Sequence, residues 1–336
     1  MKPIKIAQIG VSGFSHGDDI FATMRKFPNV FELVGYVLPE NERERLYHKL
    51  GPFEGYPELT LEQVLNDPEI EAVTVETEEV YLSKYALLAA RHGKHIHMEK
   101  PGGEDLGTFE KLIDAMRQSG KVFHTGYMYR YNPEVLELLK KIRAGELGQI
   151  LSVEAQMNSN HSVTSRSFLG TLKGGIMFFL GCHVIDLVMQ IMGKPNRIVP
   201  FNKVTGKDGL DVLDYGLAVF EYDNGVAFAK SCSSEIGGFA RRQLVVSGTK
   251  GTAELKPLEM HSGSTLQTTE VRECLDPKMP WVGRGESHVS QQYERYDDMM
   301  LSFAAMVRGE KENPNTLDYE LELYRTVLIA SGIIKQ

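Results

Sequence analysis

Two side chains in this sequence have types and settings that suit proton transfer. Lys100 directly follows Glu99 and a strand-like run, His95–Met98, and His183 lies within the apolar segment Ile176–Met192. An imidazole that titrates near neutrality, or an amine whose pKa is lowered by a neighbouring positive charge, can take a proton from a hydroxyl group. Oxidation of a secondary alcohol needs such a group, while a nicotinamide receives the hydride.

A glycine-rich turn follows the first apolar run, Ile4–Ile9, and precedes a helical pattern at Asp18–Lys26. Glycines at a strand-to-helix turn let the backbone approach a pyrophosphate, and the helix N-terminus supplies N–H groups. A G-x-G-x-x-G pattern would need glycine at Ser12 and Ser15, so the turn alone is a weak signal. The residues expected to contact a dinucleotide here are Gly10, Ser12, Gly13, Phe14, Ser15 and His16.

Strand-like and helical segments alternate through residues 1–125. Strands are expected at Ile4–Ile9, Phe31–Val37, Ala72–Val75 and His95–Met98, and helices at Asp18–Lys26, Leu61–Leu65, Tyr81–His92 and Glu110–Gln118. Such alternation favours a parallel sheet covered by helices on both faces, with right-handed crossovers. The pattern therefore predicts an α/β, doubly wound Rossmann domain over residues 1–125.

Residues 126–336 follow a different pattern, which predicts an α+β domain with a large, mostly antiparallel open sheet. Helices are expected at 133–144, 176–192, 297–307 and 319–334, and extended runs at 150–157, 198–204, 215–222, 226–233, 242–247 and 252–255. Asp223-Asn224-Gly225 is a strong hairpin signal between two of these runs. Because an open sheet covered on one face leaves an apolar face, we expect a homodimer or homotetramer formed through it.

Five segments, in order, resemble the signature motifs of the glucose–fructose oxidoreductase, inositol dehydrogenase and rhizopine-catabolism (Gfo/Idh/MocA) family. They are Ala90–Pro101 with its Glu-Lys-Pro ending, Gly126–Pro133, Gly145–Ile150, Gly174–Asp186 and Val246–Thr252. Ordered agreement from residue 4 to about 255 is far more specific than a lone glycine motif. The resemblance implies an NAD(P)-dependent dehydrogenase that acts on a secondary alcohol of a sugar, sugar acid or cyclitol.

The resemblance also implies roles for single residues. Lys100 and His183 match the family's lysine and histidine beside the nicotinamide, with His183 as acid/base and Lys100 polarising the substrate oxygen. Thr77 and Glu99 match positions near the same end of the cofactor. Substrate contacts are expected from a polar set that suits a polyhydroxylated ligand: Tyr127, Arg130, Asn160, His161, Arg166 and Asp186.

The chain departs from the family pattern at three polar positions. The acid that ends the second strand and binds the adenine ribose is Leu38 here, and the acid of the histidine motif is Phe179. The Thr-Pro-x-x-x-His segment reads Thr-Glu-Glu-Val-Tyr-Leu from Thr77. A missing ribose carboxylate removes about 1.5–3 kcal/mol of charge-assisted hydrogen bonding, unless Glu40 bends back to replace it. NAD is slightly favoured over NADP because no arginine stands at 38–41, and weak binding is expected.

Composition narrows the remaining classes of function. The 336 residues carry a formal net charge of −8 without a block of Lys and Arg, so nucleic acids and anionic membranes are poor partners. No apolar run approaches the roughly 18 residues of a spanning helix. Cys182, Cys232 and Cys274 are far apart and form no CxxC, which favours a reduced, cytoplasmic protein.

Three alternatives remain open at the sequence level. The acidic run Glu76–Glu79, with His95 and His97, allows a metal site, but helix N-terminal carboxylates are the simpler interpretation and we expect no metal. A lyase or glycosidase that oxidises its substrate transiently would keep the cofactor without a net redox change. A ligand-sensing regulator would keep the fold without the catalytic activity. The missing acids at positions 38 and 179 favour this alternative, whereas the presence of Lys100 and His183 argues against it.

Overall fold

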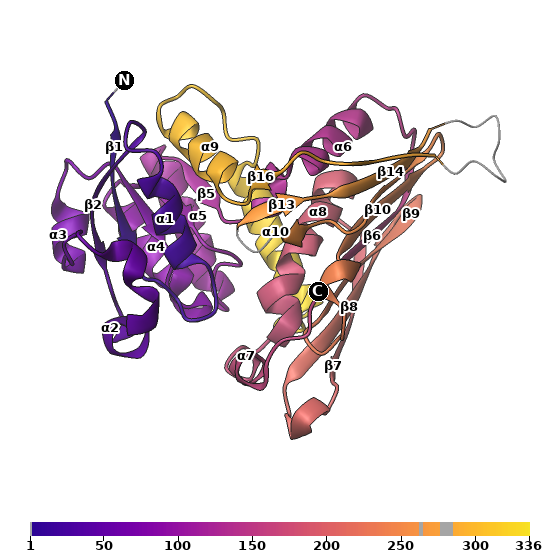
Figure 1. The fold of residues 1–336 in the computed structure, drawn as a ribbon, viewed down its shortest axis with the longest axis horizontal. Helices are drawn as coiled ribbons and strands as arrows, with labels where there is room; N and C mark the ends of the chain where they lie inside the picture. Colours follow the sequence, from indigo (N-terminus) through magenta and orange to yellow (C-terminus); the bar gives the residue numbers. More distant parts are fainter. Residues whose placement is uncertain (1, 262–264, 276–284) are drawn as a thin grey trace. The chain divides into compact units, whose positions relative to one another are not determined.

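The computed structural model describes residues 2–261, 265–275 and 285–336, which divide into two compact units (Figure 1). The N-terminal unit holds Met1–Tyr127 with Tyr296–Tyr324, and the C-terminal unit holds Met128–Arg295 with Arg325–Gln336. The sequence predicts a single domain boundary near residue 125. In the structure, the segment Tyr296–Tyr324, which lies late in the chain, also belongs to the N-terminal unit.

Side chains of the segment Tyr296–Tyr324 form hydrogen bonds with strand β5, Phe123–Thr125. Asn313 donates to the carbonyl oxygen of Phe123 at 2.7 Å, and the Thr125 hydroxyl donates to Glu320 at 2.9 Å. These bonds satisfy polar groups at the last strand of the sheet, which explains why the segment belongs with this unit.

A five-stranded parallel sheet forms the centre of the N-terminal unit, in the order β2-β1-β3-β4-β5. Its strands are β1 (Ile4–Ile9), β2 (Phe31–Val37), β3 (Ala72–Val75), β4 (His95–Met98) and β5. The apolar strand residues are buried because helices cover the sheet, as parallel sheets require. The predicted Rossmann-type domain is confirmed.

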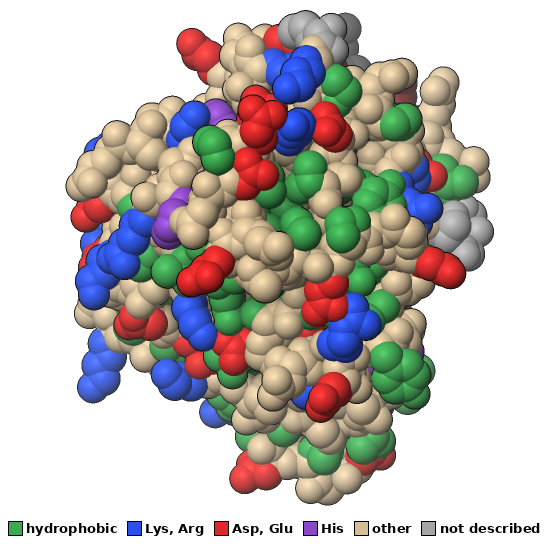
Figure 2. Space-filling view, turned by 90° about the vertical axis from the view of Figure 1, so that its left-hand side faces the viewer, with side chains coloured by type: hydrophobic (Ala, Val, Ile, Leu, Met, Phe, Trp, Pro, Cys, Tyr) green, Lys and Arg blue, Asp and Glu red, His purple; other side chains and the backbone are tan. Residues whose placement is uncertain are grey.

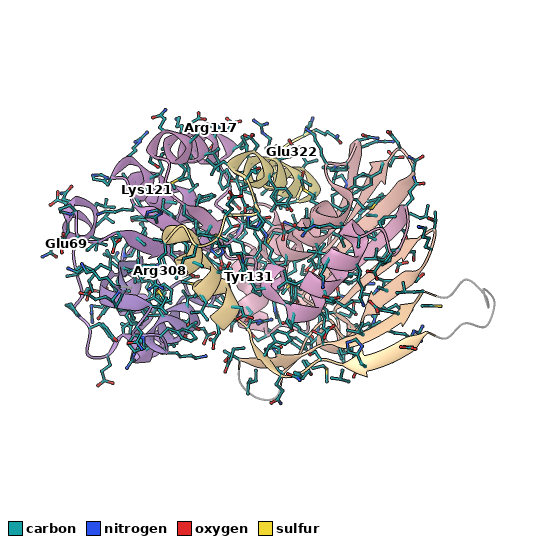
Figure 3. The ribbon with its side chains drawn as sticks, turned by 90° about the horizontal axis from the view of Figure 1, so that it is seen from above. Glu69, Arg117, Lys121, Tyr131, Arg308 and Glu322 are labelled. Atoms are coloured by element: carbon teal, nitrogen blue, oxygen red, sulfur yellow. The ribbon has the colours of Figure 1, made fainter. Side chains whose placement is uncertain are left out.

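The helices of this unit begin and end at recognisable signals. They are α1 (Gly17–Arg25), α2 (Glu42–Arg45), α3 (Leu61–Asn66), α4 (Leu82–Arg91), α5 (Leu106–Ser119) and α9 (Asp297–Val307), with short 3₁₀ turns η1 (Tyr47–Lys49), η2 (Gly51–Phe53) and η3 (Glu79–Tyr81). Asp105 caps α5, and Gly120 ends it with φ 64°. Arg117 on α5 forms an ion pair with Asp318 at the start of α10 (Leu317–Ala330), beside which it lies in Figure 3.

The C-terminal unit is built on an eight-stranded sheet in the order β15-β14-β11-β10-β6-β9-β8-β7. These strands are β6 (Ile150–Asn158), β7 (Arg197–Val204), β8 (Leu213–Tyr222), β9 (Gly225–Cys232), β10 (Gln243–Gly248), β11 (Thr252–Leu255), β14 (Glu270–Cys274) and β15 (Glu286–Val289). Every neighbouring pair is antiparallel except β6 and β9, which run parallel. A smaller sheet joins β12 (Met260–His261), β13 (Leu266–Thr268) and β16 (Tyr293–Glu294).

Helices α6 (Pro133–Arg143) and α8 (Cys182–Met192) lie on one face of the large sheet (Figure 1). Within the part of the chain that the structure describes, no helix covers the opposite face. The predicted hairpin is confirmed, because Tyr222 pairs with Gly225 across the turn between β8 and β9. The predicted large, mostly antiparallel open sheet is therefore confirmed as well.

Two surface properties bear on partners. No helix among the described residues is long and apolar enough to cross a membrane. Figure 2 shows acidic and basic side chains interspersed on the face turned to the viewer.

Candidate cofactor and active site

The loop after β1 meets the segment after β3 at the point where the strand order reverses. Open α/β sheets bind ligands at this switch point, outside the carboxyl ends of the strands. Gly10 has φ 87°, and a Cβ atom there would lie 2.6 Å from Cγ2 of Thr77. Only glycine therefore allows the close contact that brings the two loops together.

The loop residues predicted to contact a dinucleotide take different positions. Ser12 and Ser15 are buried, whereas Phe14 is 37% exposed. A Cβ atom on Gly13 would lie 3.3 Å from the Leu46 side chain. His16 stands just before α1, and its Nδ1 lies 2.9 Å from a carboxylate oxygen of Asp19.

Glu42, at the start of α2, reaches back to this loop. Its carboxylate accepts hydrogen bonds from the N–H groups of Val11 at 3.0 Å and Ser12 at 3.4 Å. Burial raises the pKa of Glu42 to about 7, although the two backbone bonds oppose the shift. The Ser12 hydroxyl accepts from the N–H groups of Phe14 and Ser15, both at 3.4 Å. A pyrophosphate at this loop would compete with Glu42 and Ser12 for the amides.

Lys49 places a positive charge beside the same loop. Its ammonium donates to the carbonyl oxygens of Ser12 at 3.0 Å and Ser15 at 2.7 Å, and it pairs with Asp18 at 2.9 Å. Sequence reasoning missed Glu42 and Lys49. The short, irregular segment after β2 has no periodicity that would indicate where its side chains point.

Glu40 does not reach the loop. Its backbone has φ 55°, and its carboxylate accepts from the Lys84 ammonium at 2.6 Å and the Tyr85 hydroxyl at 2.8 Å. The hydrogen bond from Lys84 is the main cause that lowers the pKa of Glu40. Of the two acids that follow Leu38, the one that reaches the glycine loop is therefore Glu42 and not Glu40.

Lys100 and Glu99 follow β4 at the carboxyl edge of the sheet. The Lys100 ammonium lies 3.3 Å from a carboxylate oxygen of Glu99, and both side chains are buried. A Cβ atom on Gly126 would lie 2.5 Å from the other Glu99 oxygen. Gly126 therefore makes room for the carboxylate that holds Lys100.

Two further acids, Glu76 and Glu79, are buried at the end of β3. Both are 0% exposed, and none of their four carboxylate oxygens has a hydrogen-bond partner among the described residues. Burial raises the pKa of Glu79 to about 7 and that of Glu76 well above its usual value. Repulsion from Glu99 adds to both shifts, whereas the charge of Lys100 opposes them.

A pair of histidines extends this buried polar group across the sheet. Nε2 of His97 lies 3.5 Å from a Glu76 oxygen, and Nδ1 of His97 lies 2.7 Å from Nδ1 of His124. Burial lowers the pKa of His97 to about 3, so its ring is neutral. Among the described residues, no three His, Cys, Asp or Glu side chains converge as metal ligands.

In the C-terminal unit, His183 is the second residue of α8 and packs against Tyr129. The two rings meet edge to face, with centroids 5.7 Å apart. The Tyr129 hydroxyl donates to Glu259 at 2.7 Å, and Glu259 also binds Arg242 and Arg295. The two arginines outweigh desolvation and lower the pKa of Glu259 to about 2. The sequence motifs did not reveal this buried network beside His183.

A π-helical turn, Met177–Gly181, precedes α8 and carries Phe179. The Phe179 ring is 6% exposed and meets Phe168 edge to face, with centroids 5.6 Å apart. The sequence predicts one continuous helix over 176–192, whereas the structure has a π-helical turn before the α-helix begins at Cys182. Such turns are frequent at functional sites.

Arg130 and Asp186, two predicted substrate residues, bind each other. Arg130 donates to both oxygens of Asp186, at 2.9 and 2.8 Å, and both side chains are buried. This bidentate pair joins α8 to the short turn η4 (Met128–Tyr131).

The other predicted substrate residues lie in different settings. Arg166 is 1% exposed, binds Asp208 and donates to the carbonyl oxygen of Lys207 at 3.1 Å. Asn160 accepts from the Lys207 ammonium at 2.6 Å. Burial, with help from nearby arginines, lowers the pKa of His161 to about 4. Tyr127 is buried at the boundary of the N-terminal unit.

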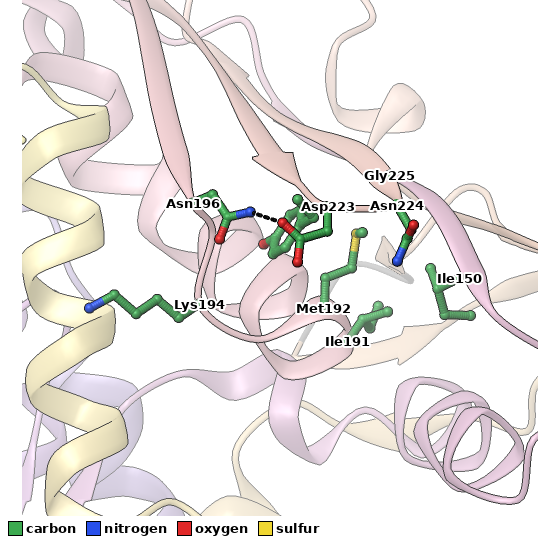
Figure 4. Close-up of a pocket in the computed structure, with 9 residues that line it drawn as sticks. Ile150, Ile191, Met192, Lys194, Asn196, Asp223, Asn224 and Gly225 are labelled. Atoms are coloured by element: carbon green, nitrogen blue, oxygen red, sulfur yellow. Dashed lines mark hydrogen bonds between the residues drawn. The ribbon is translucent and has the colours of Figure 1, made fainter.

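A cavity of about 410 Å³ opens elsewhere in the C-terminal unit, between the end of α8 and the β8–β9 hairpin (Figure 4). Its lining includes Lys194 and Asn196, and Asn196 donates to Asp223 at 2.7 Å. His183 lies at the opposite end of α8 from Met192, about 13 Å along the helix axis at 1.5 Å per residue. The cavity is therefore separate from the candidate active site.

Comparison with known proteins places both halves of the chain in one family. The model described as oxidoreductase family, NAD-binding Rossmann fold, matches residues 4–127, and the GFO/IDH/MocA C-terminal domain matches residues 135–254. The trans-1,2-dihydrobenzene-1,2-diol dehydrogenase of Bos taurus is 26% identical over 196 residues, 58% of this chain and 57% of that protein. The NADP⁺-dependent scyllo-inositol 2-dehydrogenase IolW of Bacillus subtilis (strain 168) is 27% identical over 165 residues, 48% and 46% of the two chains.

The matched region thus spans about half the length of these relatives, 57% of one and 46% of the other. Among solved structures, a levoglucosan dehydrogenase in complex with NADH and levoglucosan superimposes with a TM-score of 0.79. That match covers 98% of both chains at 18% identity, so it establishes likeness of fold. The paired domain matches, found in the expected order on a Rossmann unit and an open-sheet unit, show that this chain belongs to the GFO/IDH/MocA oxidoreductase family.

Proposed function

We propose that the protein is an NAD(P)-dependent oxidoreductase that transfers a hydride between the nicotinamide and a secondary alcohol of a sugar, sugar acid or cyclitol. The observation that carries the proposal is Lys100, held by Glu99 at the carboxyl end of β4 in the unit that matches the NAD-binding family model. Open α/β sheets bind ligands outside the carboxyl ends of their strands, which is the edge where this buried ammonium lies.

The chain's residues fit a dinucleotide at both ends. At the phosphate end, the glycine loop, the N-terminus of α1 and the Lys49 ammonium offer donors and positive charge. Toward Lys100, the buried carboxyls of Glu76 and Glu79 suit a cationic ring, because Lys100 and Glu99 are the charges that act most strongly on the two acids. When bound, the nicotinamide would accept or donate the hydride.

The proton is handled by the protein. We assign polarisation of the substrate oxygen to Lys100 and proton transfer to His183. Tyr129 packs against His183 and is itself held by Glu259, so the imidazole is positioned by a network that keeps its charges paired. Arg130 and Asp186 support the same helix, which makes positioning α8 their proposed task.

Substrate recognition is proposed to rest on the polar segment after β6. Asn158 Oδ1, Ser159 Oγ and His161 Nδ1 are buried there without hydrogen-bond partners among the described residues. Hydroxyl groups, which both donate and accept, would satisfy such a mixed set. Relatives named for an inositol and a dihydrodiol support a polyol. One relative is named for NADP⁺ and one solved structure contains NADH, which supports either cofactor.

One observation favours a second candidate function, a ligand-sensing protein without turnover. Glu42 and the Ser12 hydroxyl already occupy loop amides that a pyrophosphate would use. Leu38 removes the usual ribose acid, and Phe179 replaces an acid near His183 with an apolar ring. A cofactor-retaining lyase or glycosidase is the third possibility that the same scaffold allows.

Calorimetric titration with NAD⁺, NADH, NADP⁺ and NADPH, followed by a screen of sugars, sugar acids, cyclitols and glycosides, tests the proposal. Turnover with a net change in cofactor absorbance supports the dehydrogenase, and product without such a change supports the lyase or glycosidase. A sugar that raises the melting temperature without any turnover supports the sensor. Failure of all four dinucleotides to bind at millimolar concentration refutes the cofactor assignment.

Substitutions at the two proposed catalytic residues sharpen this test. Lys100→Met and His183→Ala should each lower turnover by about 10²–10⁴-fold, the usual effect of removing a positioned acid or base. Dinucleotide affinity should change little, because neither group is assigned to the phosphates. Near-normal turnover in either variant would show that the assignment of that residue is wrong.

A further inference from the structure

We propose that Glu76 and Glu79 sense the charge of the nicotinamide ring. Binding of the oxidised, cationic ring would release a proton from this pair, so that the chain prefers the oxidised cofactor over the reduced one. The inference rests on the proposed function, because it assumes a nicotinamide at this edge of the sheet.

Backbone contacts fix both acids deep at the carboxyl edge. The N–H group of Glu76 donates to the carbonyl oxygen of Ile9 at 2.8 Å, which ties it to the end of β1. A Cβ atom on Gly17 would lie 2.9 Å from the Glu76 Cβ, so Glu76 packs against the first residue of α1. Glu79 begins the turn η3 that follows. Lys100 and Glu99 are nevertheless the charges that act most strongly on both acids, so the pair lies between the glycine loop and the Lys100 edge proposed for the nicotinamide.

The charges around Glu76 are already matched. Lys49 is paired with Asp18 at 2.9 Å and Lys100 with Glu99 at 3.3 Å, which leaves these two cations with acids of their own. His97, 3.5 Å from Glu76, is kept neutral by burial. Among the charges of the described residues that act most strongly on Glu76, no other is positive.

The charge of an ionised Glu79 would be poorly balanced in the same way. The charges that act on it are those of Lys100, Glu99 and Glu78, of which only Lys100 is positive. An unpaired, fully buried carboxylate is costly, so Glu76 and Glu79 hold their protons while no other cation is near.

A cationic ring changes this balance. The oxidised nicotinamide carries one positive charge and the reduced ring carries none, while the phosphates are the same in both forms. A positive charge at the edge favours the ionised carboxylate, so an acid O–H bond breaks and its proton passes to the solvent without any oxidation or reduction. By linkage, the ionised acid in turn raises the affinity for the oxidised ring.

Proton-counting calorimetry on the full chain tests the inference. NAD⁺ and NADH, and in parallel NADP⁺ and NADPH, are titrated at about pH 6 in buffers that differ in ionisation enthalpy. The dependence of the binding enthalpy on the buffer gives the protons released. We expect about one proton per oxidised cofactor and close to none for the reduced form, which serves as the matched ligand control.

Substitutions identify the source of the proton. Glu76→Gln and Glu79→Gln together should abolish the release and weaken oxidised relative to reduced cofactor by about tenfold, the equivalent of one pKa unit. Glu71→Gln is the matched control, because Glu71 is exposed at the opposite end of β3 and is not among the charges named as acting on Glu76 or Glu79. This control should release the proton as the unchanged protein does.

The outcomes separate the inference from the proposed function. Binding of the oxidised cofactor without proton release, or normal release in the double variant, overturns the inference and leaves the dehydrogenase proposal intact. Failure of all four dinucleotides to bind overturns both. If the double variant does not fold, the unchanged protein still tests the inference. The protons that it releases on binding the oxidised cofactor are then compared with those released on binding the reduced cofactor.

Discussion

At the scale of single residues, buried glutamates distinguish the N-terminal unit. Glu42 and Glu79 have pKa values raised to about 7 by burial, and the pKa of Glu76 is raised well above its usual value. Each is fully or almost fully buried near the switch point. Three such acids in one small region make the folding stability of this unit depend on pH.

The direction of that dependence follows from proton linkage. Between the unfolded pKa of 4.5 and the folded value of about 7, the folded chain binds more protons than the unfolded chain. The free energy of unfolding should therefore fall as pH rises through this window. Urea unfolding at about pH 5 and about pH 7.5 measures the difference.

A substitution of Glu42 should reduce this pH dependence, because glutamine cannot lose a proton there. Glu42→Gln should unfold with more similar midpoints at the two pH values than the unchanged chain does. Glu32→Gln, at an exposed position on β2, is the control and should keep the full dependence. Equal dependence in both variants would mean that Glu42 does not titrate in this range.

At the scale of elements, the contact between the β1 loop and the β3 loop builds the candidate cofactor site. Gly10→Ala would place a Cβ atom 2.6 Å from Thr77 at a residue with φ 87°. We expect it to cost about 1–3 kcal/mol of stability, because a side chain strains this backbone region. Dinucleotide binding should weaken with it, since the two loops must separate.

Thermal unfolding and dinucleotide titration measure these two effects. Gly51→Ala is the matched control, because no atom lies within 4 Å of the added Cβ and the residue sits in a 3₁₀ turn with ordinary backbone angles. The control should match the unchanged chain in both measurements. A Gly10→Ala protein with normal stability and affinity would show that the loops are not coupled.

At the scale of the whole molecule, the uncovered face of the large sheet predicts an oligomer. Tyr215, Leu217 and Val219 on β8 and Phe228 on β9 are half-exposed on the face opposite the inward-pointing, buried residues. An apolar face of this kind is normally buried against a partner. We expect a homodimer, or a tetramer built from dimers, that joins these faces.

Light scattering with size-exclusion chromatography tests this expectation. The unchanged chain should have at least twice the mass of one chain, and Leu217→Glu should shift it toward the monomer, because a charge would be buried in the contact. Lys140→Glu changes charge on α6, on the other face of the sheet, at a side chain that is 77% exposed, and should leave the mass unchanged. A monomer at all accessible concentrations would contradict the prediction.

The amino-acid sequence by itself determined most of the elements and the family. The bounds of β1, β2, β3, β4 and β11 match the predicted ranges, because apolar runs and the glycines and prolines between them are local signals. The ordered motifs around Lys100 and His183 indicated the family for the same reason, since each motif is a short contiguous segment.

Only the tertiary structure decided which side chains meet. Glu42 reaches the glycine loop across about thirty positions, Asp186 binds Arg130, and Tyr296–Tyr324 belongs to the N-terminal unit. From the sequence, Glu76 and Glu79 resemble acids at a helix start, whereas the fold buries their carboxyl groups without hydrogen-bond partners among the described residues. Burial and pairing depend on chain segments that are distant in sequence, so no local pattern encodes them.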